Sequence, residues 1–301
     1  MNLQCTTEMR NPVSFRIDTK STTEILQIIN DEDKKVPYAV EQALPAIGNT
    51  VEAVIKAFRQ GGRLVYIGAG TSGRLGVLDA SECPPTFGVP HSMVQGIIAG
   101  GNPALTTSIE GSEDDGGAGV QACKDIGFTC KDVLVGITAN GGAPFVVAAL
   151  KYARSLGAST AAISCNAMNP AFDVVDKSYR IYLPVGPEIV TGSTRMKSGT
   201  AQKLVLNMIT TTAMIRIGKV YNNYMVDLMP VNTKLITRSI HMIGEIANCS
   251  EARAREVFEQ SGHETKTSIV MACMDCDAPF ARRMLEQNGG SINKVLDTQQ
   301  R

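Results

Sequence analysis

The stretch Arg63-Leu64-Val65-Tyr66-Ile67-Gly68-Ala69-Gly70-Thr71-Ser72-Gly73-Arg74 decides how this chain folds. Its first part, 64–67, is an apolar run without polar alternation, typical of a strand buried on both faces in a parallel sheet. Glycines and hydroxyl residues follow, and the pattern predicts a helix over 74–80. A glycine-rich turn that opens a helix favours an anion, because free N–H groups and the helix dipole point at it. Thr71 and Ser72 add hydroxyl donors, so we expect a phosphate group here.

The glycines at 68, 70 and 73 also match the spacing of the dinucleotide-binding fingerprint. That fingerprint expects an acidic residue about 20 positions further on, where it binds the ribose. No Asp or Glu lies between Cys83 and Ile109. The nicotinamide or flavin interpretation therefore lacks its confirming residue and is disfavoured.

Composition excludes several protein classes. Lys and Arg together number 29, as do Asp and Glu, so no net charge favours nucleic acid or an anionic membrane. Trp is absent and aromatic residues make up 5%, which disfavours a base-stacking surface. No apolar run approaches the roughly 18 residues of a membrane-spanning helix. We expect neither a nucleic-acid partner nor a membrane association.

The N-terminal sequence and the cysteines predict a cytoplasmic protein. The first residues lack the basic-then-apolar pattern of a signal peptide, and the eight cysteines are scattered, which favours reduced thiols over a disulfide framework. Cys273 and Cys276 form a CxxC without a second pair at zinc spacing. The three histidines show no metal-binding spacing either, so we expect no metal site.

Strands and helices alternate from residue 63 onward, which predicts an α/β fold: a parallel sheet covered by helices on both faces. Ligands of such sheets bind beyond the carboxyl ends of the strands. The predicted strands are 63–68, 93–99, 132–138, 159–165 and 179–184, with helices over 74–80, 115–126, 144–156 and 170–176.

Three domains are predicted. Residues 1–50 form an N-terminal arm and helices, with Thr22 or Thr23 capping a helix from about Glu24, a second helix after Pro37, and a third over 50–60 that leads into the next domain. Residues 51–220 hold the sheet, and 221–301 form a small helical domain with helices at 232–247, 250–260, 264–274 and 277–287. Ser250 and Asp277 are the expected N-caps of two of these.

A second anion-binding arrangement is predicted at 186–200, where hydroxyl and basic residues precede a long apolar helix that starts at Ala201. Glu188, Ser193 and Thr194 are its candidate ligand-binding residues. The alternative is an ordinary capped helix start with solvated charges.

Two acidic segments are expected at the ligand-binding edge of the sheet. Glu82 precedes Cys83-Pro84-Pro85, which is expected to end the helix, and residues 110–115 carry Glu110, Glu113, Asp114 and Asp115. A pair of carboxylates could divide acid and base work there. The residues alone do not choose among the four acids of the second segment.

These blocks resemble the N-acetylmuramic acid 6-phosphate etherases, which are built on the sugar isomerase (SIS) phosphosugar-binding fold. The resemblance covers nearly the whole chain, and the matching blocks are 7–11, 30–33, 68–76, 79–85, 110–114 and 191–203. It implies a flavodoxin-like three-layer SIS domain in a cytoplasmic homodimeric lyase of cell-wall recycling, without metal or organic cofactor. The implied reaction releases D-lactate and N-acetylglucosamine 6-phosphate.

The resemblance also assigns roles. Glu82 would protonate the departing lactate and later help activate water, and Glu113 would remove the C2 proton. The phosphosugar is expected to bind Gly70, Thr71, Ser72, Gly73, Asn140, Gly141, Glu188, Ser193 and Thr194.

One loop departs from the family pattern. After the third strand the family usually carries Ala-Ser-Gly-Arg-Thr-Pro, whereas this chain has Ala139-Asn140-Gly141-Gly142-Ala143-Pro144. Asn140 can still form hydrogen bonds, but a charge-assisted contact is missing. Two rival functions therefore stay open: a non-catalytic phosphosugar-binding regulator resembling the glucokinase regulatory protein, and an aldose–ketose phosphosugar isomerase.

Overall fold

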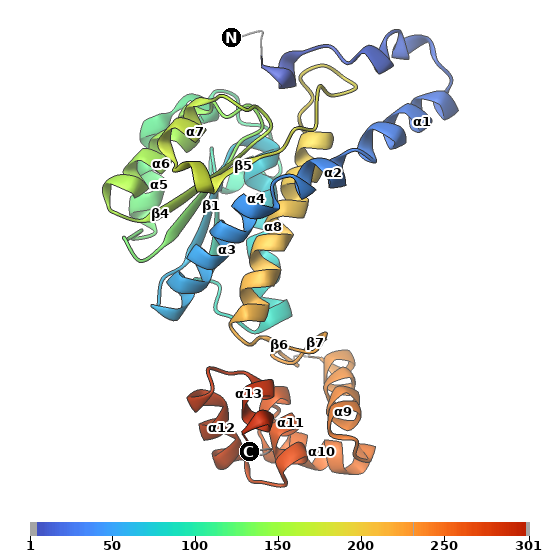
Figure 1. Cartoon of the computed structure of the whole chain (residues 1–301), viewed down its shortest axis with the longest axis vertical. Coiled ribbons are helices and arrows are strands. Elements are labelled where there is room, and N and C mark those ends of the chain that lie inside the picture. The colour runs from blue at the N-terminus through green and yellow to red at the C-terminus, as the bar shows by residue number, and fades with distance from the viewer. Residues whose placement is uncertain (1–4, 231, 299–301) are drawn as a thin grey trace. The chain divides into compact units, whose positions relative to one another are not determined.

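A computed structural model describes residues 5–230 and 232–298, and its centre is a parallel sheet in the order β2-β1-β3-β4-β5 (Figure 1). All four neighbouring pairs are parallel. The strands lie within the predicted ranges: β1 (Leu64–Gly68), β2 (Val94–Ile98), β3 (Val133–Ile137), β4 (Ser159–Ser164) and β5 (Arg180–Tyr182).

This strand order is the flavodoxin-like one, and the predicted α/β fold is confirmed. The chain leaves β1 toward β2 at one edge and then builds β3, β4 and β5 on the other side. The strand order therefore reverses between β1 and β3. Ligands of doubly wound sheets bind at such a switch point, at the carboxyl ends of the two strands.

Helices cover both faces of the sheet, as Figure 1 shows, so the domain has three layers. One face carries α5 (Gly116–Asp125), α6 (Pro144–Ser155) and α7 (Pro170–Val174); the other carries α3 (Leu44–Arg59), α4 (Gly70–Phe87) and α8 (Lys197–Arg216). Side chains of β1 alternate between these layers: Val65 and Ile67 join the core with α6, whereas Tyr66 faces α4. Both faces of β1 are buried, which explains its uninterrupted apolar sequence.

The helix after β1 differs from the prediction. It begins at Gly70 instead of Arg74 and continues through Pro84 and Pro85 to Phe87. The expectation that these prolines end the helix at once was wrong, since the helix continues for two residues beyond Pro85. Each proline lacks the N–H that would bond to the carbonyl four residues earlier, and both lie in the last turn, so this loss weakens only the end of the helix. Gly88, in the left-handed region at φ +61°, ends the helix and donates its N–H to the Pro84 carbonyl at 2.9 Å.

Short helical turns and three helices precede the sheet: η1 (Thr6–Glu8), η2 (Pro12–Ser14), η3 (Ile17–Thr19), α1 (Thr22–Asp33), α2 (Val36–Glu41) and α3. The N-cap of α1 is Ser21 rather than the predicted Thr22 or Thr23. Ser21 and Glu24 form a reciprocal capping box, which satisfies two N–H groups at once. Helix α3 starts six residues before the predicted position, at Leu44.

Clustering of the described residues gives two compact units. Those up to Ser81 join His91–Thr210 around the sheet, and Glu82–Pro90 join the chain from Thr211 onward. The second unit holds a hairpin and five helices: β6 (Val220–Tyr221), β7 (Tyr224–Met225), α9 (Thr233–Ala247), α10 (Glu251–Gln260), α11 (Thr265–Met274), α12 (Ala278–Gln287) and α13 (Ile292–Asp297).

The second unit has its own core, which includes Ile243, Phe258 and Val295. Ser250 and Asp277 cap α10 and α12, as predicted. The hairpin and α13 were not predicted. Within the described part of the chain, no helix has the length and apolar character needed to cross a membrane.

Candidate functional site

A cavity of about 270 Å³ lies at the switch point of the sheet and collects most of the predicted loops. We call it the switch-point pocket. Its lining comes from the turns after β1 and β3, from the segment ahead of α8 and from two acidic residues: 69–72, 137–140, Ala143, Gly192, Thr194, Glu8 and Glu113. Segments from five separate parts of the sequence thus meet where doubly wound sheets bind ligands.

The N-terminus of α4 forms one wall of this pocket. Gly70 has a φ of +53°, which lets the chain turn directly from β1 into the helix. The N–H groups of the first helical turn have no partner within the helix and so favour an anion. Ser72 is buried, and its hydroxyl donates to Oε1 of Gln202 at 2.9 Å, which leaves the Ser72 oxygen as an acceptor. Thr71 is the half-buried hydroxyl that can donate into the pocket.

Two predicted ligand-binding glycines are not among the lining residues. A Cβ on Gly73 would lie 2.7 Å from the Gly68 carbonyl oxygen and 2.7 Å from Cγ1 of Ile98, so this glycine lets α4 pack closely on the sheet. Gly141 has a φ of +81°, and a Cβ there would lie 2.1 Å from Cγ of Asn169. Both glycines shape the frame of the pocket.

Asn140 lines the pocket in the loop that departs from the family pattern. Its Oδ1 accepts hydrogen bonds from the Gly142 N–H at 2.8 Å and from the Thr138 hydroxyl at 3.3 Å. These two donors fix the orientation of the amide, because only the oxygen can accept. Within the described residues the Asn140 Nδ2 has no hydrogen-bond partner. Asn140 can therefore offer a donor to an anionic or hydroxyl-bearing ligand.

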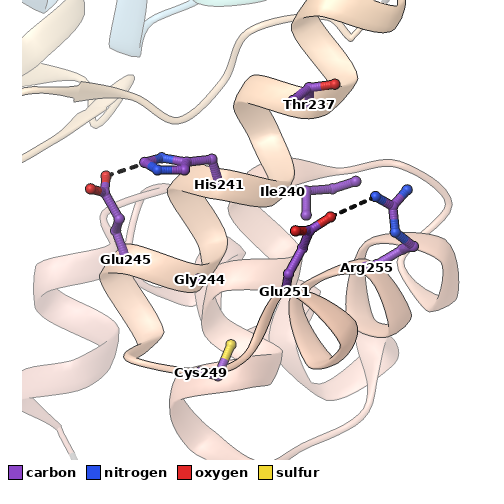
Figure 2. Close-up of a pocket in the computed structure, with 8 residues that line it drawn as sticks. All are labelled: Thr237, Ile240, His241, Gly244, Glu245, Cys249, Glu251 and Arg255. Carbon is purple, nitrogen blue, oxygen red and sulfur yellow. Dashed lines mark hydrogen bonds and ion pairs between the residues drawn. The ribbon is translucent and has the colours of Figure 1, made fainter.

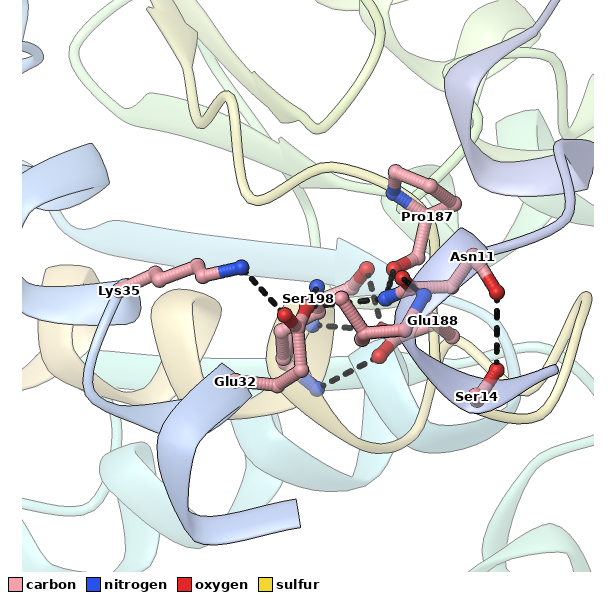
Figure 3. Close-up of polar contacts among 9 residues, drawn as sticks. Asn11, Ser14, Glu32, Lys35, Pro187, Glu188 and Ser198 are labelled. Atoms are coloured by element: carbon pink, nitrogen blue, oxygen red, sulfur yellow. Dashed lines mark hydrogen bonds and ion pairs between the residues drawn. The ribbon is translucent and has the colours of Figure 1, made fainter. Parts of the chain in front are cut away.

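Of the three ligand-binding residues predicted in the segment ahead of α8, only one lines the pocket. Thr194 lines the pocket; Ser193 is half-buried and does not. Glu188 is fully buried, and its carboxylate accepts from the Lys197 N–H at 3.1 Å, the Ser198 N–H at 2.9 Å and the Ser198 hydroxyl at 2.9 Å (Figure 3). The structure thus places Glu188 as the carboxylate that caps α8, away from the pocket lining.

A buried ion pair joins this segment to the N-terminal part of the chain. Lys197 is 2% exposed, and its Nζ lies 2.5 Å from Oε2 of Glu32. Burial raises the pKa of Glu32, but hydrogen bonds from Lys197, Lys35 and Asn11 outweigh it and lower the pKa to about 2. The Asn11 amide donates to Glu32 and to the Pro187 carbonyl, both at 2.9 Å (Figure 3).

Glu8 lines the pocket, although sequence analysis did not select it as a site residue. It follows Thr7, which is 1% exposed and bonded to Asn166 through both its N–H and its hydroxyl. Asn11 holds the same segment three residues further on. The Glu8 carboxylate has no hydrogen bond or ion pair among the residues that the structure describes. The only sequence signal for Glu8 was that it lies in block 7–11, which resembles the etherase family. Such a resemblance does not show where the residue lies in the folded chain.

Among the four acids of 110–115, Glu113 alone lines the switch-point pocket. It belongs to η5 (Ser112–Asp114) and also borders a second hollow of about 180 Å³, with Gly70, Arg74 and Glu110. Asp115 caps α5 through the Ala118 N–H at 2.9 Å. Glu110 accepts from the Ser108 hydroxyl at 3.1 Å.

Glu82 is not brought into either hollow. It is exposed, lies on α4 twelve residues after Gly70, and is not among the residues that line the two hollows. The expectation of an edge position for Glu82 depended on a helix over 74–80 that ends before this residue, whereas α4 continues through it to Phe87.

A larger cavity, of about 320 Å³, lies in the second unit (Figure 2). Its polar side chains pair with one another: Nδ1 of His241 lies 3.4 Å from the Glu245 carboxylate, and Arg255 lies 2.9 Å from Glu251. None of the predicted site residues lines it. The switch-point pocket therefore remains the candidate site.

Comparison with known protein families gives two matches. Residues 46–154 match the N-terminal SIS domain of glucokinase regulatory protein, and residues 222–277 match the C-terminal lid domain of that protein. The first matched region contains β1 to β3 and most of the pocket lining.

Similar proteins match along nearly the full length. The chain is 51% identical to the N-acetylmuramic acid 6-phosphate etherase of Rhizobium rhizogenes and 53% identical to that of Glaesserella parasuis, in each case over 97% of this chain and 95% of the relative. The Yersinia pestis etherase is 50% identical over 96% of this chain and 97% of its own.

A solved structure from Bacteroides fragilis, described as a phosphosugar isomerase involved in capsule formation, matches with a TM-score of 0.50 at 18% identity. The match covers 65% of this chain and 91% of that one. It shows the shared fold alone.

Proposed function

Because this chain belongs to the family of N-acetylmuramic acid 6-phosphate etherases, we propose that it cleaves the D-lactyl ether of N-acetylmuramic acid 6-phosphate. Lactate is eliminated and water is added, which gives N-acetylglucosamine 6-phosphate and D-lactate. The observation that carries this proposal is the identity of 50% or more with three etherases over at least 96% of the chain.

The pocket supports the proposal at the phosphate end of the substrate. The first turn of α4 and the hydroxyls of Thr71 and Thr194 suit a phosphoryl group, and the Asn140 Nδ2 adds a donor. Glu8 adds a carboxylate, which can accept hydrogen bonds from sugar hydroxyls. A phosphosugar bound at its phosphate would hold its carbon atoms against Glu113.

Glu113 is the proposed base. In the open-chain sugar the neighbouring aldehyde acidifies the C2 proton, which a positioned carboxylate can remove. The electron pair left at C2 then forms the C2–C3 double bond as the C3–O bond breaks. A carboxylic acid must protonate the leaving lactate oxygen, and we assign this step to Glu82. Water then adds at C3, and C2 regains a proton.

A second copy of the chain would supply Glu82, because this residue does not line the pocket that contains Glu113. We therefore propose a homodimer in which each pocket combines groups from two chains. We also propose that the enzyme works in the cytoplasm, in keeping with its eight free cysteines.

Release of D-lactate from N-acetylmuramic acid 6-phosphate tests the reaction. Wild-type protein is expected to release one lactate per substrate, and Glu113→Gln and Glu82→Gln are each expected to lower kcat at least about 10³-fold with the substrate still bound. Asp114→Asn is the matched control, because Asp114 neighbours Glu113 but lines neither hollow. Near-wild-type turnover of Glu113→Gln would remove it as the base.

The matches to glucokinase regulatory protein favour a second candidate, a non-catalytic phosphosugar-binding regulator. Such a protein would bind a phosphosugar and release no lactate in the same assay. A phosphosugar isomerase would interconvert an aldose and a ketose phosphate, also without lactate.

A further inference from the structure

The two walls of the switch-point pocket that carry Glu8 and Asn140 meet at one buried side chain. Asn166 follows β4 and is 3% exposed. Its Nδ2 donates to the Thr7 hydroxyl at 3.2 Å and to the Asn140 carbonyl at 3.1 Å, and its Oδ1 accepts the Thr7 N–H at 3.4 Å. Every polar atom of this amide is therefore used to link the two walls.

The backbone of Asn166 is itself held by the end of the sheet. Its N–H donates to the Ser164 hydroxyl at 3.2 Å, and its carbonyl accepts from Nδ2 of Asn169 at 2.8 Å. Asn169 caps α7, and its Oδ1 accepts the Phe172 N–H at 3.0 Å. The backbone of Asn166 is thus fixed by hydrogen bonds to the end of β4 and to the residue that caps α7, and both elements are rigid.

The linked walls carry complementary groups. Glu8 follows Thr7 directly and has only acceptor oxygens, whereas Asn140 offers the Nδ2 donor. Asn166 is not among the pocket-lining residues, so it can act on a ligand only through these neighbours. The first turn of α4, where the phosphate is proposed to bind, has no hydrogen bond to Asn166.

We propose that Asn166 is a positioning residue that sets the spacing of Glu8 and Asn140 across the pocket and so determines how tightly the sugar part of the substrate is held. This inference rests on the proposed function. Loss of the amide removes the hydrogen bonds that join Thr7 to the Asn140 carbonyl, so the spacing of the two walls is no longer fixed, and the anion site at α4 stays in place. Sugar-phosphate affinity should then fall without a matching fall in affinity for a simple anion.

Binding to N-acetylglucosamine 6-phosphate and to inorganic phosphate, measured by calorimetry, tests this proposal. Asn166→Ala is expected to weaken sugar-phosphate binding about tenfold, as for a charge-assisted hydrogen bond, and to leave phosphate binding within about twofold. Asn49→Ala is the matched control, because its amide makes one exposed hydrogen bond, to Ser178. Parallel weakening of both ligands, or no weakening of either, would contradict the proposal.

A double-mutant cycle distinguishes positioning of Glu8 by Asn166 from a general loosening of the pocket. If Asn166 acts through Glu8, the loss of sugar-phosphate affinity caused by Asn166→Ala should be at least about threefold smaller in a Glu8→Ala background than in the wild-type chain. Additive effects would rule out this route. Asn166→Asp, which keeps the size and the acceptor but loses the donor, should show the same selective loss and replaces the alanine variant if that one does not fold.

The outcomes for the reaction and for Asn166 can be told apart. A wild-type protein that binds the sugar phosphate but releases no lactate would overturn the etherase proposal, and the binding cycle would still decide the role of Asn166. A wild-type protein that binds no sugar phosphate would overturn both.

Discussion

Lys197 shows how one buried charge supports the candidate site. It is buried at the start of α8 and pairs with Glu32, and Glu32 also accepts a hydrogen bond from the Asn11 amide. Burial of a charge is costly unless the charge is paired and hydrogen-bonded. The pair therefore couples the N-terminal segment, and with it Glu8, to the loop that carries Thr194.

Removal of the cation should be strongly destabilising. We expect Lys197→Met to lower the free energy of unfolding by about 3–5 kcal/mol, because the Glu32 carboxylate keeps its burial and loses its main partner. Urea titration measures the change. The control is Lys34→Met, which breaks an exposed pair with Asp31 and should cost less than about 1 kcal/mol. Equal losses in the two variants would contradict the structural role of the buried pair.

The lowered pKa of Glu32 predicts that the stability of the protein depends on pH in the acidic range. The pKa of Glu32 falls from 4.5 to about 2 on folding, so its contribution to stability is complete above pH 4.5 and is lost as the pH falls toward 2. The free energy of unfolding of Glu32→Gln should therefore change less steeply across this interval than that of the wild type. Urea titrations at several pH values in the interval measure both slopes, and identical slopes would contradict the lowered pKa.

At the scale of single residues, the sequence predicted several of the residues that line the pocket, but it did not always predict what each residue does. It selected Thr71, Asn140, Thr194 and Glu113, which line the pocket. It also selected Glu188 as a ligand-binding residue, whereas the structure shows its carboxylate bonded to the start of α8. A carboxylate ahead of a helix can serve either purpose, and only its burial and partners distinguish them.

Helix α4 connects the buried strand β1 to the anion site, and its contact with the sheet depends on Gly73. We expect Gly73→Ala to destabilise the protein by about 1–3 kcal/mol, because the new methyl group would overlap the Gly68 carbonyl and Ile98. The start of α4 would shift, so sugar-phosphate binding should weaken too.

Gly48→Ala provides the control with the opposite sign. Gly48 is the fifth residue of α3, inside the helix, and an added Cβ meets no atom within 4 Å. Alanine favours a helix interior over glycine, so this change should stabilise the protein by about 0.5–1 kcal/mol. Thermal unfolding of the two variants measures both signs. Stabilisation by Gly73→Ala would show that α4 does not need its close approach to the sheet.

Elements with a strong apolar pattern could be predicted from the sequence, and their ends were less certain. All five strands and the helices α5 and α6 lie where the pattern placed them. The ends of α4 were misjudged on both sides, because a glycine can open a helix and two prolines can occupy its last turn. Local sequence does not specify these outcomes, since they depend on packing against β1 and on the turn at Gly88.

At the scale of the assembly, the proposed dimer predicts that two inactive variants can complement each other. Glu82→Gln and Glu113→Gln are each expected to be inactive alone. If each pocket takes one acid from each chain, a mixed dimer has one pocket with both acids intact and one with neither. Random mixing makes half the dimers mixed, so about a quarter of wild-type activity should return. Unmixed samples at the same total concentration are the control, and no recovery after subunit exchange would mean that both acids come from one chain.

The arrangement of distant segments is the part of the site that sequence could not supply. Glu8 reaches the pocket because Thr7 bonds to Asn166, 159 positions away in the chain. No local pattern encodes such a contact. The fold class followed from periodicity, whereas this wall of the pocket follows from a few long-range hydrogen bonds.

The attachment of Thr7 to Asn166 also has a consequence for biosynthesis. One wall of the pocket is translated first, yet the side chain that holds it emerges from the ribosome only after most of the sheet has been made. Contacts between residues so far apart in sequence form late, because the intervening loop must close first. A nascent chain stalled before Asn166 should therefore lack sugar-phosphate affinity, and the ability to bind should appear only once the segment that carries Thr194 has also left the exit tunnel.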